Sequence, residues 1–484
     1  MTCSILFGLA GLAGLAFAQP SVSVNPRSGP PTDNVTIGGA GFGPSESVDI
    51  YFDTADLALA ATSPAGAFSG IRLAIPASAT PGPHSITAVG RQSGLGAQAS
   101  FLVRADWPEF RGGPERQGYN PTENVLNSSN VVGMEVRWIA ALGSPGPTMG
   151  SPAAAGGMVY MPSFNGILQA FRATTGQPVW SAATGGIDNS PAVAHGVAYV
   201  GAYLGLYAFH AATGQALWTA ATGDITYSSA AVAGGRVYAG SYDNKLSAVD
   251  TATGEVVWSA ATGSIIDSSP AVANGIVYVG SYDHKLHAFY ANTGQPVWTA
   301  STSSFILSSP AVADGRVFVG SDDHSVYAFN AATGQPLWSA ATGGNVASSP
   351  AVANGLVYVG SGDRNLYALN AGTGQTIWTA ATGGYIRSSP AVANGVVYVG
   401  SDDSRIYAFS AATGQPLWSA VTGGAIESSP AVANGFVYVG SDDGHLYAYG
   451  LPPTAPLMPP YPGPLSRTAR PESASTFRAS PAGN

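Results

Sequence analysis

The sequence predicts an all-β protein whose larger part is an eight-bladed β-propeller. One phrase, Ser-Ser-Pro-Ala-Val-Ala-Asn-Gly-x-Val-Tyr-Val-Gly-Ser-x-Asp in its fullest form, returns every 39 or 40 residues between Pro152 and Pro430. Regular spacing over eight copies indicates that each copy is one supersecondary unit of an array. The composition agrees, because 63 glycines and only 9% charged residues in 484 suit short strands joined by tight turns.

Each repeat contains four runs with strand character, as the copy at 269–300 illustrates. The expected strands are 269–273, 276–281, 285–290 and 295–300, named A to D in chain order. Asn274-Gly275 between A and B is typical of a two-residue hairpin turn of type I′. Asp283, between B and C, is suited to capping backbone N–H groups of the next turn. Four antiparallel strands in about 40 residues are typical of a propeller blade.

The two ends of the array predict that it closes on itself. The last copy, 429–449, has runs A to C but neither a fourth run nor a tryptophan, whereas 135–140 has the pattern of strand D and carries Trp138. We expect this earlier segment to complete the last blade, which would leave no sheet of the ring unfinished and exposed to edge pairing.

The remaining residues predict four further segments. Residues 1–18 are apolar and end Ala16-Phe17-Ala18, which indicates a cleaved signal peptide; a membrane anchor is the alternative, although the run is short for a span. The single cysteine, Cys3, lies there, so the mature chain would have no disulfide. Alternating runs in 19–104 predict a small β-sandwich. Residues 105–132 are expected to be an irregular connector, and the Pro- and Ser-rich 451–484 a disordered tail.

Two of these regions resemble known families. The phrases 25–29 (Asn-Pro-Arg-Ser-Gly) and 37–43 (Ile-Gly-Gly-Ala-Gly-Phe-Gly) resemble IPT/TIG immunoglobulin-like domains, which implies a spacer or adhesive module for 19–104. The repeated Thr-Gly-x-x-x-Trp, as at 213–218, resembles the tryptophan-docking motif of pyrroloquinoline-quinone (PQQ) repeat propellers. The tryptophans occur once per blade, which favours structural docking over cofactor stacking; they are Trp138, Trp180, Trp218, Trp258, Trp298, Trp338, Trp378 and Trp418.

Quinoprotein dehydrogenases of the PQQ-repeat class imply a PQQ and Ca²⁺ site, and in many members a disulfide between adjacent cysteines. This chain has no such cysteine pair, and we expect neither a cofactor nor a metal site. The aspartates at one turn position of successive repeats are expected to cap turns rather than bind metal; they are Asp243, Asp283, Asp323, Asp363, Asp403 and Asp443.

Candidate ligand residues lie where copies that agree elsewhere differ. The position just before the Ser-Ser-Pro phrase reads Met149, Asp188, Tyr227, Asp267, Leu307, Ala347, Arg387 and Glu427 around the ring. It opens strand A, the innermost strand, on the face where the D–A loops and B–C turns should meet. The ligand candidates are therefore Asp188, Tyr227, Asp267, Arg387 and Glu427, with a rim of Asp322, His324, Arg364, Asp402, Arg405, Asp442 and His445. Drift on a solvated face would produce the same variation.

These observations predict an exported, monomeric, non-catalytic scaffold that binds a protein or glycan in the periplasm, at the cell surface or outside the cell. A net charge of −9 and only two lysines exclude nucleic acid as a partner, because phosphate binding needs clustered cations. No catalytic group of residues stands out. The alternatives are a PQQ- and Ca²⁺-dependent oxidoreductase, which the resemblance implies, and a lectin that uses aromatic residues such as Tyr227 and Tyr385.

Overall fold

The computed structural model describes residues 19–453, except Ser144, Pro147, Met149, Phe164, Ile187, Asp188 and Thr226. The expected signal peptide and almost all of the expected disordered tail lie outside these residues. The chain divides into two units at Leu451, and every element described below belongs to the first. Within the described residues, no helix has the length and apolarity needed to cross a bilayer.

The N-terminal part folds into two sheets around its own apolar core. One sheet has the order β1-β3-β6 and the other β2-β8-β7-β4-β5. Val35, Ile37, Ile50, Ile86 and Phe101 are among the fully or almost fully buried side chains between them. The strands are β1 (Ser21–Asn25), β2 (Ser28–Gly29), β3 (Asn34–Ala40), β4 (Ser47–Phe52), β5 (Ala55–Ala61), β6 (Phe68–Ala74), β7 (Gly82–Gly90) and β8 (Gly96–Val103).

The connector, residues 105–132, is mostly irregular, with two short 3-10 helices and one short strand. These are η1 (Phe110–Gly112), β9 (Tyr119–Asn120) and η2 (Val131–Gly133).

The repeats form antiparallel sheets of four strands, and β9 adds to one of them in parallel. Given from the first to the last strand of each repeat, they are β11 (Ala153–Ala155), β12 (Met158–Ser163), β13 (Ile167–Arg172), β14 (Pro178–Ala183); β15 (Ala192–Ala194), β16 (Val197–Ala202), β17 (Gly205–His210), β18 (Ala216–Ala220); β19 (Ala231–Ala233), β20 (Arg236–Gly240), β21 (Lys245–Asp250), β22 (Val256–Ala261); β23 (Ala271–Ala273), β24 (Ile276–Gly280), β25 (Lys285–Tyr290), β26 (Pro296–Ser301); β27 (Ala311–Ala313), β28 (Arg316–Ser321), β29 (Ser325–Asn330), β30 (Pro336–Ala341). The remaining strands are β31 (Ala351–Ala353), β32 (Leu356–Gly360), β33 (Asn365–Asn370), β34 (Thr376–Ala381); β35 (Ala391–Ala393), β36 (Val396–Ser401), β37 (Arg405–Ser410), β38 (Pro416–Val421); and β39 (Ala431–Ala433), β40 (Phe436–Ser441), β41 (His445–Gly450) with β10 (Glu135–Ala141).

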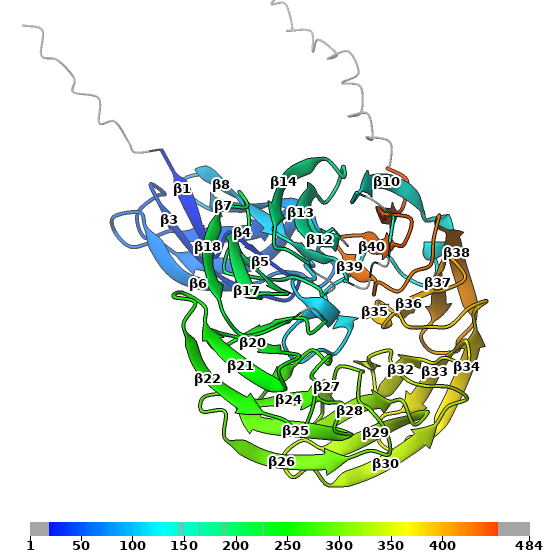
Figure 1. Ribbon diagram of the computed structural model, residues 1–484. Coiled ribbons are helices and arrows are strands. Elements are labelled where there is room, and N and C mark those ends of the chain that lie inside the picture. The colour runs from blue at the N-terminus through cyan, green and yellow to red at the C-terminus, as the bar shows by residue number, and fades with distance from the viewer. Residues whose placement is uncertain are drawn as a thin grey trace, which may run out of the picture. The chain divides into compact units, whose positions relative to one another are not determined.

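These sheets follow one another around a common centre (Figure 1), which is the arrangement of a β-propeller. The first strands of successive repeats contact one another in chain order, and β39 of the last repeat contacts β11 of the first. β10 pairs antiparallel with β41, so the last sheet is completed by the segment that the sequence predicts. The ring of sheets is therefore joined at the two ends of the repeat region.

The local predictions hold for the A–B hairpin but place the start of strand A too early. Asn274 and Gly275 have φ of 50° and 77°, as a type I′ turn requires. The first strand of this repeat is β23, which begins at Ala271 rather than at 269. Pro270 has no N–H, and Ser269 N donates to Ser309 Oγ of the next repeat (2.9 Å), so neither can join the ladder with β24.

Apolar side chains fill the space between neighbouring sheets. Tyr278 and Leu286 of one repeat share a buried cluster with Val317 and Phe329 of the next, and similar clusters recur around the ring. The core of the repeat region is thus a series of layers between sheets.

The blade tryptophans lie on the outermost strands and join each sheet to the next. Trp298 Nε1 donates to Ala331 O (3.0 Å), and its ring covers Gly334 so closely that a Cβ there would lie 2.6 Å from Cδ2. Gly334 also has φ of 71°, which favours glycine. At the seam of the ring, Trp418 Nε1 donates to Met134 O (3.0 Å). Seven of the eight tryptophans are only half-buried, whereas Trp138 is 8% exposed.

Candidate functional site

The repeat region has two chemically different faces. Thr262 Oγ1, in a D–A loop, donates to Asn244 O of a B–C turn (3.1 Å), and Gly263 N donates to Asp283 Oδ2 of the next repeat (3.0 Å). The D–A loops and B–C turns therefore share one face, as predicted, which we call the loop face. The A–B and C–D connections lie at the opposite ends of the strands, on what we call the turn face.

The turn aspartates of the loop face cap turns, as expected. Asp283 Oδ1 accepts from Lys285 N (3.1 Å), and Asp443 Oδ1 accepts from His445 N (3.0 Å). The second carboxylate oxygen accepts from the D–A loop of the preceding repeat at several blades, as Asp403 Oδ2 does from Gly383 N (2.7 Å). Within the described residues, no group of three or more His, Cys, Asp or Glu side chains is placed to hold a metal ion.

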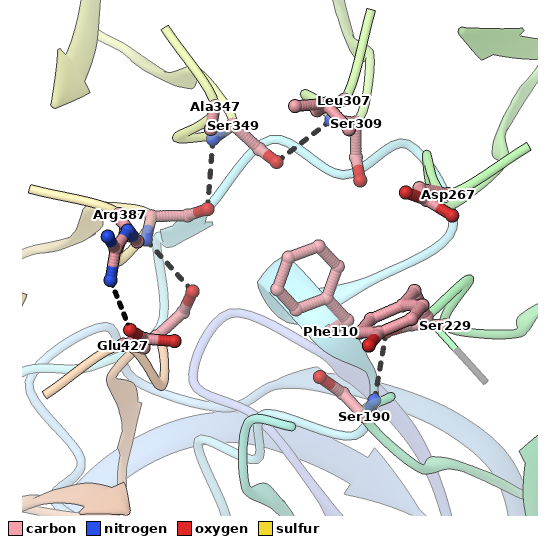
Figure 2. A pocket seen from close by; sticks show the side chains of 13 residues that line it. Phe110, Ser190, Ser229, Asp267, Leu307, Ser309, Ala347, Ser349, Arg387 and Glu427 are labelled. Atoms are coloured by element: carbon pink, nitrogen blue, oxygen red, sulfur yellow. Dashed lines mark hydrogen bonds and ion pairs between the residues drawn. The ribbon is translucent and has the colours of Figure 1, made fainter. Parts of the chain in front are cut away.

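A closed ring of serines lies at the centre of the loop face. The second serine of each Ser-Ser-Pro phrase donates its backbone N–H to the hydroxyl oxygen of the equivalent serine in the next repeat. The eight bonds measure 2.8 or 2.9 Å and run through Ser151, Ser190, Ser229, Ser269, Ser309, Ser349, Ser389 and Ser429, then back to Ser151. We call this set the serine ring, and part of it is drawn in Figure 2.

Above the serine ring lies a pocket of about 200 Å³. Six of the eight variable positions predicted from the repeat comparison line it: Tyr227, Asp267, Leu307, Ala347, Arg387 and Glu427. The two others, Met149 and Asp188, lie outside the described residues. Six serines of the ring and Phe110 complete the lining.

One side of the pocket is aromatic and acidic. Asp267 Oδ2 accepts from the Tyr282 hydroxyl (2.5 Å), and Oδ1 is buried. Burial raises the pKa of Asp267, and the neighbouring Tyr282 and Tyr242 hydroxyls oppose that shift. Tyr227 stacks on Tyr242 with ring centroids 5.7 Å apart, and Tyr282 stacks on Phe305 at 5.0 Å.

The opposite side of the pocket carries a charge cluster. Arg387 Nη1 pairs with Glu427 Oε1 and lies 3.2 Å from Asp402 Oδ2. Asp402 belongs to the predicted rim, and burial raises its pKa while Arg387 lowers it. Arg387 is therefore engaged with two carboxylates, and the described lining residues include two acids, Asp267 and Glu427, and one base, Arg387.

The floor of the pocket comes from the connector, which the sequence did not indicate. Phe110 rises from η1 into the centre of the ring (Figure 2), and the Arg116 guanidinium lies 5.6 Å from the centroid of its aromatic ring. Arg116 is fully buried and donates to the carbonyls of Pro270 (2.9 Å) and Ala230 (2.6 Å) on two inner strands. The Arg111 guanidinium likewise donates hydrogen bonds to Pro350 O and Pro390 O.

The connector touches the inner strand of every sheet in chain order. Backbone N–H groups of the inner strands donate to successive connector oxygens, for example Val193 N to Pro108 O (2.8 Å) and Val392 N to Gly118 O (2.7 Å). At the first sheet, Trp107 and Ala154 exchange two backbone hydrogen bonds (both 2.7 Å). At the last sheet, Asn120 Nδ2 donates to Val432 O (2.8 Å). Residues 107–120 therefore fill the middle of the ring below the pocket.

Six of the positions predicted from the sequence line this pocket, whereas the serine ring and Phe110 were not predicted. Serine occupies the same position in all eight repeats, even where Ala230 replaces the proline that follows, and this constancy was the available signal. Phe110 carries no signal of its own, because it lies outside the repeats in a segment without periodicity.

A family model described as outer membrane protein assembly factor BamB matches residues 133–244, 164–265, 204–305 and 365–451, which together span more than half of the chain. A search of curated proteins finds no match.

Among solved structures, BamB from Moraxella catarrhalis is 23% identical, with a TM-score of 0.56, over 66% of this chain and 97% of that one. A europium-containing methanol dehydrogenase is 14% identical, with a TM-score of 0.62, over 72% and 98%. The quinohemoprotein alcohol dehydrogenase from Comamonas testosteroni is 15% identical, with a TM-score of 0.63, over 78% and 83%. At these identities the structures show the fold alone. Together with the family match, they show that this chain belongs to the BamB family of PQQ-repeat β-propellers.

Proposed function

We propose that this protein is an exported, non-catalytic binding scaffold whose partner docks on the loop face. In this proposal the repeats form a closed eight-bladed propeller, and the N-terminal sheets form an immunoglobulin-like spacer of the IPT/TIG type. The matching family, an outer membrane protein assembly factor, supports a protein partner at the cell envelope; a glycan partner is the other possibility within this proposal.

The observation that carries this proposal is the pocket. Six variable positions from separate repeats converge on one concave surface. A ligand site needs such a place, where a few distinctive side chains meet over a rigid frame. The turn face offers little to discriminate with, because its A–B turns repeat Asn-Gly at 274–275, 354–355, 394–395 and 434–435.

The alternative function is a PQQ- and Ca²⁺-dependent oxidoreductase, which the folds of the dehydrogenase neighbours favour. The residues at the pocket do not fit these groups. PQQ is a tricarboxylate, whereas the part of the lining that the structure describes contains Asp267, Glu427 and one cation, Arg387, that is already paired. Ca²⁺ requires six to eight converging oxygens, and the two carboxylates stand on repeats on different sides of the ring (Figure 2).

Capture by the immobilised full chain from a solubilised envelope extract tests the scaffold proposal. Asp267→Asn and Glu427→Gln, which remove charge at the pocket, should reduce the amount of the captured partner. Asp314→Asn removes the same charge in the A–B turn of the turn face and should not, since asparagine stands at this position in other repeats. If only Asp314→Asn lost capture, the partner would dock on the turn face and the proposal would be wrong.

A separate experiment tests the oxidoreductase alternative. Purified protein incubated with PQQ and Ca²⁺ should gain no quinone absorbance after gel filtration and no dye-linked oxidation of alcohols or sugars. Stoichiometric retention of the quinone with such turnover would replace the scaffold by the oxidoreductase.

A further inference from the structure

The serine ring has hydrogen-bonding capacity that the fold itself does not use. Each hydroxyl oxygen accepts a backbone N–H, and none of the described residues accepts a hydrogen bond from the hydroxyl of a ring serine. A hydroxyl that accepts one bond still has a proton to donate. Ser229, Ser309 and Ser349 are 3–4% exposed and line the pocket, so their protons are available to a molecule bound there.

The pocket wall supplies the complementary acceptors. Asp267 and Glu427 line the pocket on different sides of the ring, and each carboxylate can accept hydrogen bonds from a bound molecule. A ligand that fits must therefore accept hydrogen bonds from below and donate them to the wall. Alcohols with several hydroxyl groups do both, because each hydroxyl is a donor and an acceptor.

The floor adds an apolar surface. Phe110 lines the pocket, and the Arg116 guanidinium lies over its ring, 5.6 Å from the centroid, so a ligand would meet the face of the ring opposite Arg116. A second cation on that face would be repelled by Arg116 through the ring, whereas the C–H groups of a neutral ring pack on it without a charge penalty.

Charge and size restrict the ligand further. Among the described lining residues, two carboxylates against one paired arginine disfavour an anion. The volume of about 200 Å³ is smaller than the roughly 300–1,000 Å³ typical of pockets for drug-sized ligands, so the site suits one small ring or the end of a longer chain.

We infer that this pocket binds one neutral pyranose ring, as the terminal sugar of a glycan, stacked on Phe110 between the serine hydroxyls and Asp267. This inference rests on the proposed function, because it names the ligand class of the same loop-face site.

Saturation-transfer NMR with the full chain and four methyl pyranosides (glucoside, galactoside, mannoside and N-acetylglucosaminide) tests the inference. At least one should receive saturation, most strongly on the C–H groups of one ring face. Asp267→Asn should weaken its binding about tenfold or more, because a charged acceptor is lost, and Ser309→Ala about threefold. Phe110→Leu should remove the face-selective saturation while retaining an apolar floor.

Matched controls separate pocket effects from unfolding. Asp314→Asn on the turn face should leave the affinity unchanged, and thermal melting should show that each variant is folded. If Asp267→Asn melts early, Glu427→Gln provides the second pocket variant. Methylguanidinium and glucuronate serve as the cationic and anionic probes.

Absence of saturation for all four pyranosides, or tighter binding of either charged probe, overturns the sugar inference. If the pyranosides fail but Asp267→Asn still loses envelope capture, the scaffold proposal stands without the sugar. If a pyranoside binds through Asp267 while capture is unaffected by the pocket variants, the sugar inference stands and the scaffold proposal fails.

Discussion

Each serine of the central ring serves its own sheet and the neighbouring sheet at once. Ser349 N donates to Ser389 Oγ (2.9 Å), which satisfies an N–H that cannot join the ladder because strand A begins two residues later. A buried N–H without a partner would be costly, so the constant serine allows the inner strands to meet closely. The variable residue two positions earlier is then free to differ from repeat to repeat.

At the same scale, we predict that Trp338→Ala destabilises the protein by about 3 kcal/mol through the cavity and the lost contacts. Trp338 Nε1 donates to Ala371 O (3.0 Å), and the centroids of the Trp338 and Phe318 rings are 5.8 Å apart. Trp338→Phe keeps an aromatic ring and should cost less. Urea denaturation of both variants measures the effect, and an unchanged midpoint for Trp338→Ala would show that the docking contact is not structural.

A second residue-scale prediction concerns pH. Burial raises the pKa of Glu109 to about 7, and the charge of Arg116, 3.9 Å away, opposes the shift. The carboxyl of an unfolded chain titrates near its ordinary pKa of 4.5, so the folded state binds more protons between these values. The contribution of Glu109 to stability is therefore greatest below pH 4.5 and falls as the pH rises toward 7.

Glu109→Gln tests this prediction, because glutamine can keep the hydrogen bond from Val232 N without titrating. The melting temperature of the variant relative to the wild type should rise between pH 4.5 and 8. Parallel curves would mean that the pKa of Glu109 is close to its ordinary value.

At the scale of elements, the connector acts as a central support. Its oxygens accept from the inner strands that would otherwise leave N–H groups unpaired around a channel, and Arg111 and Arg116 satisfy inward-facing carbonyls. Burial lowers the pKa of Arg111 to about 9 and that of Arg116 to about 10, so both remain charged at neutral pH.

Closure of the ring by β10 gives a prediction for one element. Deleting 135–141 should leave β41 with an unpaired edge and Met134 without its contact to Trp418, so aggregation and a lower melting temperature are expected. A synthetic peptide of 134–142 should restore solubility, whereas a scrambled peptide should not. A soluble deletion variant with unchanged melting would contradict this role of β10.

The strands and turns of the repeats could be predicted from the sequence, whereas the contacts of the connector could not. The A–B hairpins were predictable from the repeat period and the Asn-Gly turns, and β10 from the missing fourth run of the last copy. Each of these signals is a local pattern in the sequence. The floor of the site was not predictable in this way. Phe110 and Arg116 meet the ring through contacts such as Arg116 Nη2 to Ser229 O (3.0 Å), 113 residues apart, and no local pattern encodes them.

At the scale of the whole molecule, the proposed function belongs to one face of a rigid ring. The repeats build a constant frame, the connector fills its centre, and the side chains that differ between repeats gather over the serine ring. A partner that recognises this protein should therefore contact the D–A loops and leave the A–B turns and C–D loops free.

Photo-crosslinking from two matched tyrosines tests this claim most directly. Tyr385 lies in a D–A loop of the loop face and is 48% exposed; Tyr290 ends β25 on the turn face and is 50% exposed. Each is replaced by a benzophenone-bearing phenylalanine in the full chain, which is then irradiated in the native envelope extract. We expect a discrete crosslinked product, protein or glycan, from position 385 and none from position 290. A product from position 290 with none from 385 would contradict it.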